Sequence, residues 1–184
     1  PIIYLTEKGK AKIAANSFVK NIVSQKHVIG LNVGVGTKWP SKGWPLKRWK
    51  ELIEKLDLDK NNLLLLGGPE EIEIIGQLKK EYKFLVDTGF ENSLLEFTAI
   101  VDLCDLIITA DTMALHIATA LEKKIIALFG PTSSNEIELY GKGIKLIAQG
   151  GCNCYYKKYC SEDVSCMEKI TPDMVIKAIT ELNG

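Results

Sequence analysis

Residues 106–129 read LIITADTMALHIATALEKKIIALF, and this stretch decides the fold class. Its two ends, Leu106–Thr109 and Ile125–Phe129, are short apolar runs without alternation, which is typical of strands buried on both faces of a parallel sheet. The stretch between them, Thr112–Leu121, has the composition of a short helix. A strand, a helix and a strand in this order indicate a βαβ unit, and therefore an α/β domain with a parallel sheet.

The same alternation extends outward in both directions. Further strands are predicted at Val28–Val33, Leu63–Leu66, Phe84–Val86 and Ile144–Ala148. Further helices are predicted at Leu46–Leu56, Glu70–Tyr82, Leu94–Leu103 and Pro172–Leu182. We therefore predict one Rossmann-like, doubly wound α/β domain over residues 28–184.

Residues 1–27 differ from the rest of the chain. An extended segment, Pro1–Leu5, precedes a predicted helix at Thr6–Val23. This helix is either an interdomain linker that leads in from an earlier domain, or an N-terminal helix that packs on the sheet. Because the chain begins with Pro1 and not with Met, we expect a longer protein in which the function is shared with another segment.

Composition excludes several classes of function. The 184 residues include 23 Lys plus Arg and 23 Asp plus Glu, so no broad basic surface for nucleic acid is expected. The sequence has no signal peptide and no apolar run near the roughly 20 residues of a membrane-spanning helix. We expect a cytoplasmic protein.

The first predicted strand is followed by the glycine-rich segment GVGTKWPSKGWP at residues 34–45. Glycines let a backbone approach an anion closely, and Thr37, Lys38, Ser41 and Lys42 add hydroxyls and positive charge. The Gly-Lys-Ser/Thr order of a Walker loop is absent. A solvated turn with two ordinary lysines is the alternative.

The next strand end carries GGPEE at residues 67–71. Acidic side chains suit the positive end of the helix that follows, which explains one of Glu70 and Glu71. The other is a candidate to accept hydrogen bonds from ribose hydroxyls, a role that carboxylates often have at strand ends.

The segment after Leu106–Thr109 begins a helix. We predict Asp111 as its N-cap, with Thr112 and Met113 at a helix start whose free N–H groups suit a pyrophosphate. His116 lies one turn further on, and we favour a functional role for it over that of a satisfied core histidine. With the Gly130–Ser134 turn, four strand ends carry glycine, hydroxyl or charged groups, which indicates a phosphate-bearing ligand.

Four of the five cysteines fall within fifteen positions, in the pattern Cys-x-Cys-x5-Cys-x5-Cys. They are Cys152, Cys154, Cys160 and Cys166. This spacing leaves a structural zinc site, reduced thiols and disulfides as alternatives, and from sequence alone we assign no metal ligand.

Several of these segments together resemble glycosyltransferase family 9, which includes the heptosyltransferases of the lipopolysaccharide inner core. The similar segments are DTMALHIATAL at 111–121, IIALFGPT at 125–132, KGWPL at 42–46 with Trp49, GGPE at 67–70, and the Cys152–Cys166 region with Ile170-Thr171-Pro172. The resemblance implies one half of a two-domain GT-B enzyme, the carboxyl-terminal half that binds the nucleotide sugar, commonly ADP-heptose. It also implies inversion at the anomeric carbon, with no cofactor and no essential metal ion.

The resemblance further implies roles for individual residues. Asp111, Thr112 and Met113 would contact the diphosphate and the sugar, with His116 near them. Lys42 would stabilise the leaving group, assisted by Thr37 or Lys38, and Glu71 or Glu70 would meet the ribose. Many family members have glycine where this chain has Met113, so the backbone is expected to approach the phosphate less closely.

The missing partner implied by this resemblance is an amino-terminal domain that binds the acceptor and supplies the catalytic base. A peripheral contact of the full-length protein with the inner membrane is a further expectation. Two alternatives stay open: a sugar-nucleotide epimerase of the same GT-B architecture, and a nucleotide-binding module without a catalytic half.

Overall fold

The computed structural model describes residues 21–22 and 25–183. The predicted Pro1–Leu5 segment lies outside these residues, as does nearly all of the predicted Thr6–Val23 helix, so the linker stays a prediction. Among the described residues, no helix combines the length and the apolar character that crossing a bilayer requires.

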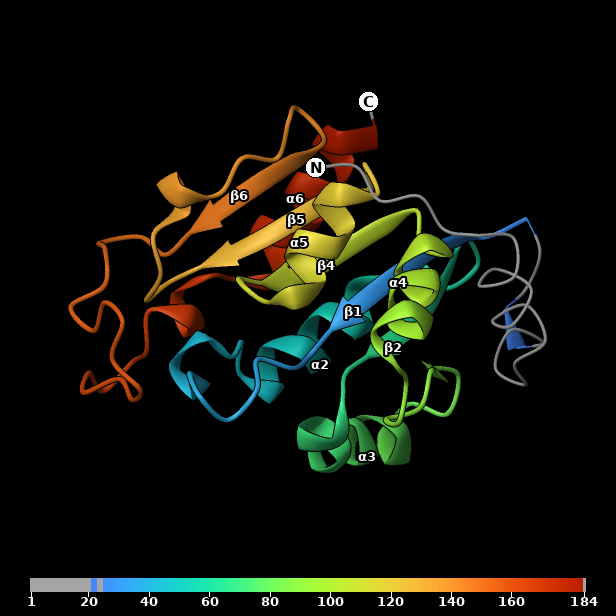
Figure 1. Cartoon of the computed structure of the whole chain (residues 1–184), viewed down its shortest axis with the longest axis horizontal. Helices are drawn as coiled ribbons and strands as arrows, with labels where there is room; N and C mark the ends of the chain where they lie inside the picture. Colours follow the sequence, from blue (N-terminus) through green and yellow to red (C-terminus); the bar gives the residue numbers. More distant parts are fainter. Residues whose placement is uncertain (1–20, 23–24, 184) are drawn as a thin grey trace.

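A six-stranded parallel sheet forms the centre of the domain (Figure 1). Its strands are β1 (His27–Asn32), β2 (Asn61–Leu66), β3 (Val86–Asp87), β4 (Leu106–Ala110), β5 (Lys124–Phe129) and β6 (Gly143–Ile147). They lie in the order β3-β2-β1-β4-β5-β6, and every neighbouring pair is parallel. The predicted α/β doubly wound fold is confirmed, and the strand order reverses between β1 and β4.

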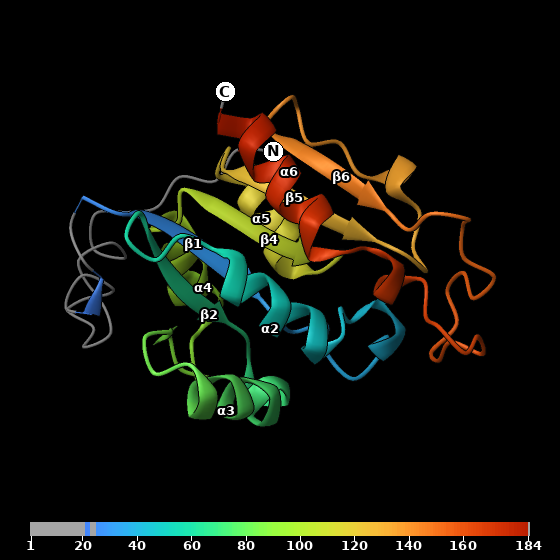
Figure 2. The same cartoon turned by 180° about the vertical axis from the view of Figure 1, so that it is seen from behind.

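Helices cover both faces of this sheet. The α-helices are α2 (Leu46–Lys55), α3 (Ile72–Glu81), α4 (Leu94–Asp102), α5 (Met113–Ala120) and α6 (Pro172–Asn183). Helices α4 and α5 lie over one face (Figure 1), and α2 and α6 lie over the other (Figure 2). Short 3-10 turns occur at η2 (Pro40–Lys42), η3 (Pro69–Glu71), η4 (Ser134–Glu136) and η5 (Met167–Lys169).

The sheet separates the core into two apolar clusters. Along β2, Leu63 and Leu65 belong to the cluster under α2 and α6, whereas Leu64 and Leu66 belong to the cluster under α4 and α5. Successive side chains of a strand point to opposite faces, so a strand covered on both sides must be apolar at every position. This is the physical reason why the unbroken apolar runs predicted the sheet.

The structure differs from the predicted boundaries mainly at the sheet edge. The strand predicted at Phe84–Val86 is a two-residue edge strand, Val86–Asp87, paired with Leu64 and Leu65. Phe84 precedes this strand, and its side chain is exposed. An edge strand pairs with one neighbouring strand only, so the apolar pattern of its sequence does not define where it begins and ends. The helix predicted from Glu70 likewise begins as a 3-10 turn and becomes α-helical at Ile72.

Candidate functional site

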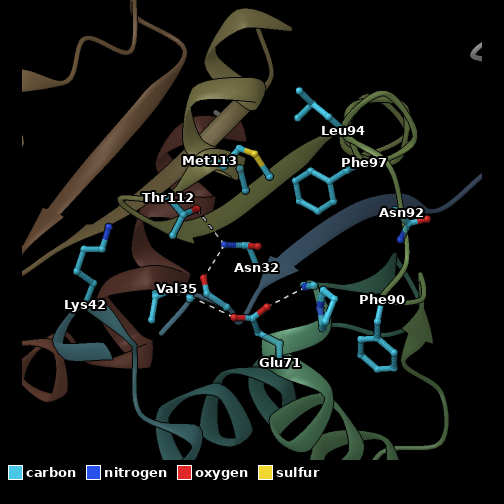
Figure 3. A pocket seen from close by; sticks show the side chains of 16 residues that line it. Asn32, Val35, Lys42, Glu71, Phe90, Asn92, Leu94, Phe97, Thr112 and Met113 are labelled. Carbon is cyan, nitrogen blue, oxygen red and sulfur yellow. Dashed lines mark hydrogen bonds between the residues drawn. The ribbon is translucent and has the colours of Figure 1, made fainter. Parts of the chain in front are cut away.

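A cavity of about 550 Å³ opens beyond the carboxyl ends of β1, β2 and β4, where the strand order reverses (Figure 3). It is lined by Asn32, Gly34, Val35, Gly36, Lys42, Gly67, Gly68, Pro69, Glu71, Phe90, Asn92, Leu94, Phe97, Thr112, Met113 and Ala114. Ligands of open parallel sheets collect at this position, because the loops on the two sides of the reversal diverge and leave a crevice.

A second cavity, of about 560 Å³, lies beside the first along helix α5. It is lined by Lys42, Asp111, Thr112, Met113, His116, Ile117 and Ala120. Lys42, Thr112 and Met113 line both cavities, so the two spaces meet at these three residues. The arrangement offers one long binding site with a cation and a helix start at its middle.

Asn32, the last residue of β1, connects the two sides of the site. Its side chain is buried, and its Nδ2 amide lies 3.0 Å from the Gly34 carbonyl oxygen, 3.0 Å from Thr109 Oγ1 and 3.1 Å from Thr112 Oγ1. One amide therefore fixes the glycine-rich loop after β1 against the start of α5. The sequence analysis did not single out Asn32. The available signal was one polar residue at the carboxyl end of an otherwise apolar strand, because buried amides are retained only where partners satisfy them.

The two carboxylates after β2 hold the glycine-rich loop. Glu71 accepts from the backbone N–H of Gly68 at 2.8 Å and of Gly36 at 3.2 Å. Glu70 accepts from the backbone N–H of Thr37 at 2.7 Å and from its hydroxyl at 3.1 Å. Glu71 is half-buried and lines the first cavity, whereas Glu70 is exposed and lines neither cavity.

Gly34 is required by this arrangement. A Cβ atom at residue 34 would lie 2.4 Å from Glu71 Cδ, closer than non-bonded carbon atoms can come. Glycine therefore allows the loop to pass directly over the carboxylate. The predicted close backbone approach occurs here, with a side chain of the protein on the other side.

Helix α5 begins one residue later than predicted, and its N-cap is Thr112 and not Asp111. Thr112 has extended backbone angles, with φ −139° and ψ 177°, and its side chain makes no capping bond. Its hydroxyl is instead 3.1 Å from both Asn32 Nδ2 and Thr109 Oγ1. Because no side chain caps this end, the first N–H groups of α5 are left for solvent or an anion.

Lys42 lies at the junction of the two cavities, at the end of η2. Its ammonium donates to the Asp111 carbonyl oxygen at 2.5 Å, across from the start of α5. Burial lowers the pKa of Lys42 below its ordinary value, the Asp111 carboxylate acts to raise it, and the charge of Lys38 lowers it further. A cation that has already lost part of its hydration shell binds an anion with a smaller desolvation cost.

Asp111 and His116 face each other in the second cavity, with 3.9 Å between Asp111 Oδ1 and His116 Nε2. The His116 side chain is 64% exposed, so it is not a core histidine. Asp111 is the less exposed partner, at 22%. Both side chains are placed to exchange hydrogen bonds with a ligand that enters this cavity.

Apolar side chains line the part of the first cavity away from Lys42. Phe90, Leu94 and Phe97 lie on that side, and they come from the segment after β3 and from α4 (Figure 3). Asn92 holds this segment by donating to the carbonyl oxygens of Thr88 at 3.0 Å and Gly89 at 3.1 Å. The sequence analysis missed this wall, because it belongs to a loop that only the folded chain brings to the cavity.

Besides Glu70, two further predicted residues line neither of the two cavities. Thr37 and Lys38 are exposed and line neither space, and the Thr37 side chain is engaged by Glu70. Contact of Thr37 and Lys38 with a ligand stays a prediction. The Gly130–Ser134 turn also lines neither cavity, and its Pro131 carbonyl oxygen accepts from the Tyr156 N–H at 2.9 Å.

Cys152, Cys154 and Cys166 come together beyond the end of β5, with Cys160 next to Cys154, whereas Cys104 lies apart, under β1. Burial raises the pKa of the Cys104 thiol to about 12 and that of Cys166 to about 11. Such thiols are weak nucleophiles at neutral pH, because the thiolate is the reactive form.

Comparisons with known proteins show the family of the chain. The model of glycosyltransferase family 9 (heptosyltransferase) matches residues 4–168. Lipopolysaccharide heptosyltransferase 2 of Salmonella typhimurium is 26% identical over 131 residues, which cover 68% of this chain and 37% of the relative.

Solved structures of the family share the fold, as two examples show. ADP-heptose lps heptosyltransferase II of E. coli superposes with a TM-score of 0.74 at 22% identity, over 99% of this chain and 53% of that one. A glycosyl transferase family 9 protein of Veillonella parvula gives 0.82 at 21% identity, over 98% and 53%. The chain thus spans about half of each structure, as expected for one half of a GT-B enzyme.

Proposed function

The chain belongs to glycosyltransferase family 9, and from this premise we propose that it is the nucleotide-sugar-binding half of a heptosyltransferase. In this proposal another domain binds the acceptor and supplies the catalytic base. The observation that carries the proposal is the meeting of two cavities at Lys42 and at the uncapped start of α5. A nucleotide sugar has a matching arrangement, because its charged diphosphate lies between an uncharged nucleoside and an uncharged sugar.

The diphosphate is assigned to the junction. Lys42 supplies a partly desolvated positive charge there, and the N–H groups at the start of α5 supply the positive end of a helix dipole. Charge-assisted hydrogen bonds of this kind are about twice as strong as neutral ones. Met113, the first residue of α5, lines both cavities together with Lys42.

The nucleoside is assigned to the first cavity. Phe90 and Phe97 give it an apolar wall suited to the faces of a base, and the Glu71 carboxylate has acceptor capacity left for ribose hydroxyls. Both oxygens of Glu71 already accept backbone N–H groups, which fixes their position before any ligand binds. The similar E. coli protein is an ADP-heptose lps heptosyltransferase II, so we take adenine as the base.

The sugar is assigned to the second cavity, beside Asp111 and His116. The Asp111 carboxylate accepts from sugar hydroxyls, and His116, 3.9 Å away, is positioned to donate or accept in turn. Of the donor-binding residues predicted from sequence, Lys42, Glu71, Asp111, Met113 and His116 keep a place at the ligand in this proposal. Glu70 becomes a residue that positions the glycine-rich loop through Thr37.

The proposed reaction is an inverting glycosyl transfer. A hydroxyl of the acceptor attacks the anomeric carbon, the bond from that carbon to the diphosphate oxygen breaks, and ADP leaves with the electron pair. Negative charge grows on the departing oxygen, so a fixed cation and helix dipole stabilise the transition state more than the ground state. Lys42 and the start of α5 would supply this stabilisation, and the acceptor-side domain would take the proton.

Calorimetry on the 184-residue chain tests the proposal with ADP, UDP and ADP-heptose as separate ligands. We expect ADP to bind, ADP-heptose to bind at least as tightly, and UDP to bind more weakly because a pyrimidine fills less of the Phe90–Phe97 wall. No heat with either adenine nucleotide at millimolar concentration would contradict the assignment. A clear preference for UDP would favour the epimerase alternative, and binding of ADP without any gain from heptose would favour a nucleotide-binding module.

A further inference from the structure

The segment between β6 and η5 brings four thiols to one place. The Sγ atoms of Cys152, Cys154 and Cys166 all lie within 4.8 Å of one another, and Cys152 Sγ is 2.8 Å from Cys154 Sγ. The Cys160 thiol is a further neighbour of Cys154, outside this tighter group of three. Cys154 therefore has three thiol neighbours, and all four cysteines are free.

This geometry fits a metal ion better than a pair of disulfides. A disulfide gives each sulfur a single sulfur partner, whereas a tetrahedral tetrathiolate site surrounds one point with four sulfurs. With zinc–sulfur bonds of about 2.3 Å, the sulfurs of such a site are roughly 3.8 Å apart. The separations among the Sγ atoms of Cys152, Cys154 and Cys166, from 2.8 Å to within 4.8 Å, lie on both sides of this value.

The backbone around the cluster makes room for it. Gly130, directly after β5, would carry a Cβ atom only 2.7 Å from Cys166 Sγ and 2.6 Å from Met167 Sδ. A side chain at residue 130 would therefore push Cys166 out of the cluster. Glycine at the end of a central strand lets the thiol reach its place against the core.

Apart from the thiols, the segment has no regular secondary structure and buries little apolar surface of its own. Residues 148–166 contain no helix or strand. Its larger apolar side chains, Tyr155, Tyr156, Tyr159 and Val164, are exposed. Only cysteines and Ala148 at its start contribute buried apolar surface to the core. Irregular loops of this length inside compact domains are uncommon without a functional or structural reason.

We propose that Cys152, Cys154, Cys160 and Cys166 bind one thiophilic metal ion, zinc by commonest use, which holds this segment in place. Binding replaces the four thiol protons by four metal–sulfur bonds and releases the protons to solvent. The tetrahedral S₄ donor set selects zinc or iron over magnesium and calcium, which take oxygen ligands. The site is closed by protein sulfurs, so its role is structural.

The metal-held segment supports the turn that carries Lys42. The Ser41 N–H donates to the Lys158 carbonyl oxygen at 3.2 Å, and the Ser41 hydroxyl donates to that of Lys157 at 2.6 Å. Tyr156 packs edge-on against Trp39, with ring centroids 6.5 Å apart. The metal ion would thus position η2 from outside, through the loop, without contacting a ligand in the cavities.

Elemental analysis of the chain purified without chelator tests the proposal. We expect about one zinc or iron ion per chain, as in tetrathiolate sites generally. Cys160→Ser removes a ligand at the less buried edge of the cluster, and it should lose the metal. Cys104→Ala is the matched control, because it removes a buried cysteine outside the cluster, and it should keep the metal.

A second measurement covers the case in which Cys160→Ser does not fold. Metal-free wild-type protein, reduced and titrated with Co²⁺, should develop the intense sulfur-to-cobalt charge-transfer absorption and visible bands of a tetrahedral thiolate site. Folded wild-type protein without metal and without these bands would overturn the proposal. So would a mass that shows intact disulfides, or full metal content in folded Cys160→Ser. Neither measurement uses a nucleotide, so both are independent of the proposed function.

Discussion

Replacing Lys42 by methionine removes the ammonium at the junction of the two cavities and keeps most of the length of the side chain. Lys42 is half-buried, and its ammonium donates a hydrogen bond to the Asp111 carbonyl oxygen. A hydrogen bond to a charged group contributes about 1.5–3 kcal/mol. Because Lys42 is partly buried, its interaction with the diphosphate should be stronger than that of an exposed ion pair. At about 1.4 kcal/mol per tenfold change, ADP should bind roughly 10- to 100-fold more weakly.

Isothermal titration with ADP measures this effect, and thermal unfolding of the free variant shows whether it is folded. Lys47→Met is the matched control, because the Lys47 side chain is 76% exposed and lines neither cavity. We expect this control to bind ADP as the wild type does. The reasoning is refuted if folded Lys42→Met binds within about twofold of wild type, or if Lys47→Met loses as much affinity.

The remaining predictions concern pH, the sugar and the glycine-rich loop. Because burial lowers the pKa of Lys42 below its ordinary value of 10.5, its charge is lost earlier as the pH rises, so ADP affinity should decline on the alkaline side below pH 10.5. Lys42→Arg, which keeps its charge throughout this range, should flatten the titration profile. Asp111→Ala should weaken the binding of ADP-heptose by about 1–3 kcal/mol. The binding of ADP should stay as in the wild type, because Asp111 lines only the second cavity. Gly34→Ala places a Cβ atom 2.4 Å from Glu71 Cδ, so the free energy of unfolding measured in urea should fall by about 1–3 kcal/mol. The affinity for ADP should fall as well.

Each of these has its own control. If the ADP affinity of Lys42→Arg declined with rising pH in parallel with that of the wild type, deprotonation of Lys42 would not be the cause of the decline. If Asp111→Ala weakened the binding of ADP and of ADP-heptose equally, the assignment of the sugar to the second cavity would be wrong. Gly76→Ala is the control for the loop, because a Cβ atom at residue 76 meets nothing within 4 Å. That helical substitution should be neutral or stabilise by up to about 1 kcal/mol, and a loss equal to that of Gly34→Ala would show that the close contact is irrelevant.

Much of the fold follows from local patterns. The runs at Leu63–Leu66 and Ile125–Phe129 predicted strands that the structure confirms to within two residues, since burial on both faces leaves no polar position in them. The helix start after Leu106–Thr109 was also predictable, although its N-cap is Thr112. The Thr112 hydroxyl, expected to serve the ligand, accepts a hydrogen bond from Asn32 instead. This contact between the end of β1 and the start of α5 is not revealed by adjacency in sequence.

The site itself is less local. Lys42 and Asp111 are 69 residues apart, and Phe90 joins them from a third loop. Sequence reasoning found Lys42 and Asp111 through their place after strands, because the carboxyl ends of parallel strands share one edge. It missed Phe90 and Asn32, and it gave Glu70 and Glu71 equal standing. Which of the two carboxylates faces the cavity depends on the 3-10 turn at residues 69–71. A 3-10 turn rotates successive side chains differently from an α-helix, and residue spacing in the sequence does not reveal which of the two forms.

The order of apolar and polar residues by itself determined the parallel sheet, its helices and the edge where a ligand would bind, because periodicity and strand direction are properties of the chain. The tertiary structure alone decided that two cavities meet at Lys42 and that four cysteines converge beyond β5. Both depend on loops brought together from distant segments, where packing between neighbouring elements, and not local preference, sets the direction of each side chain.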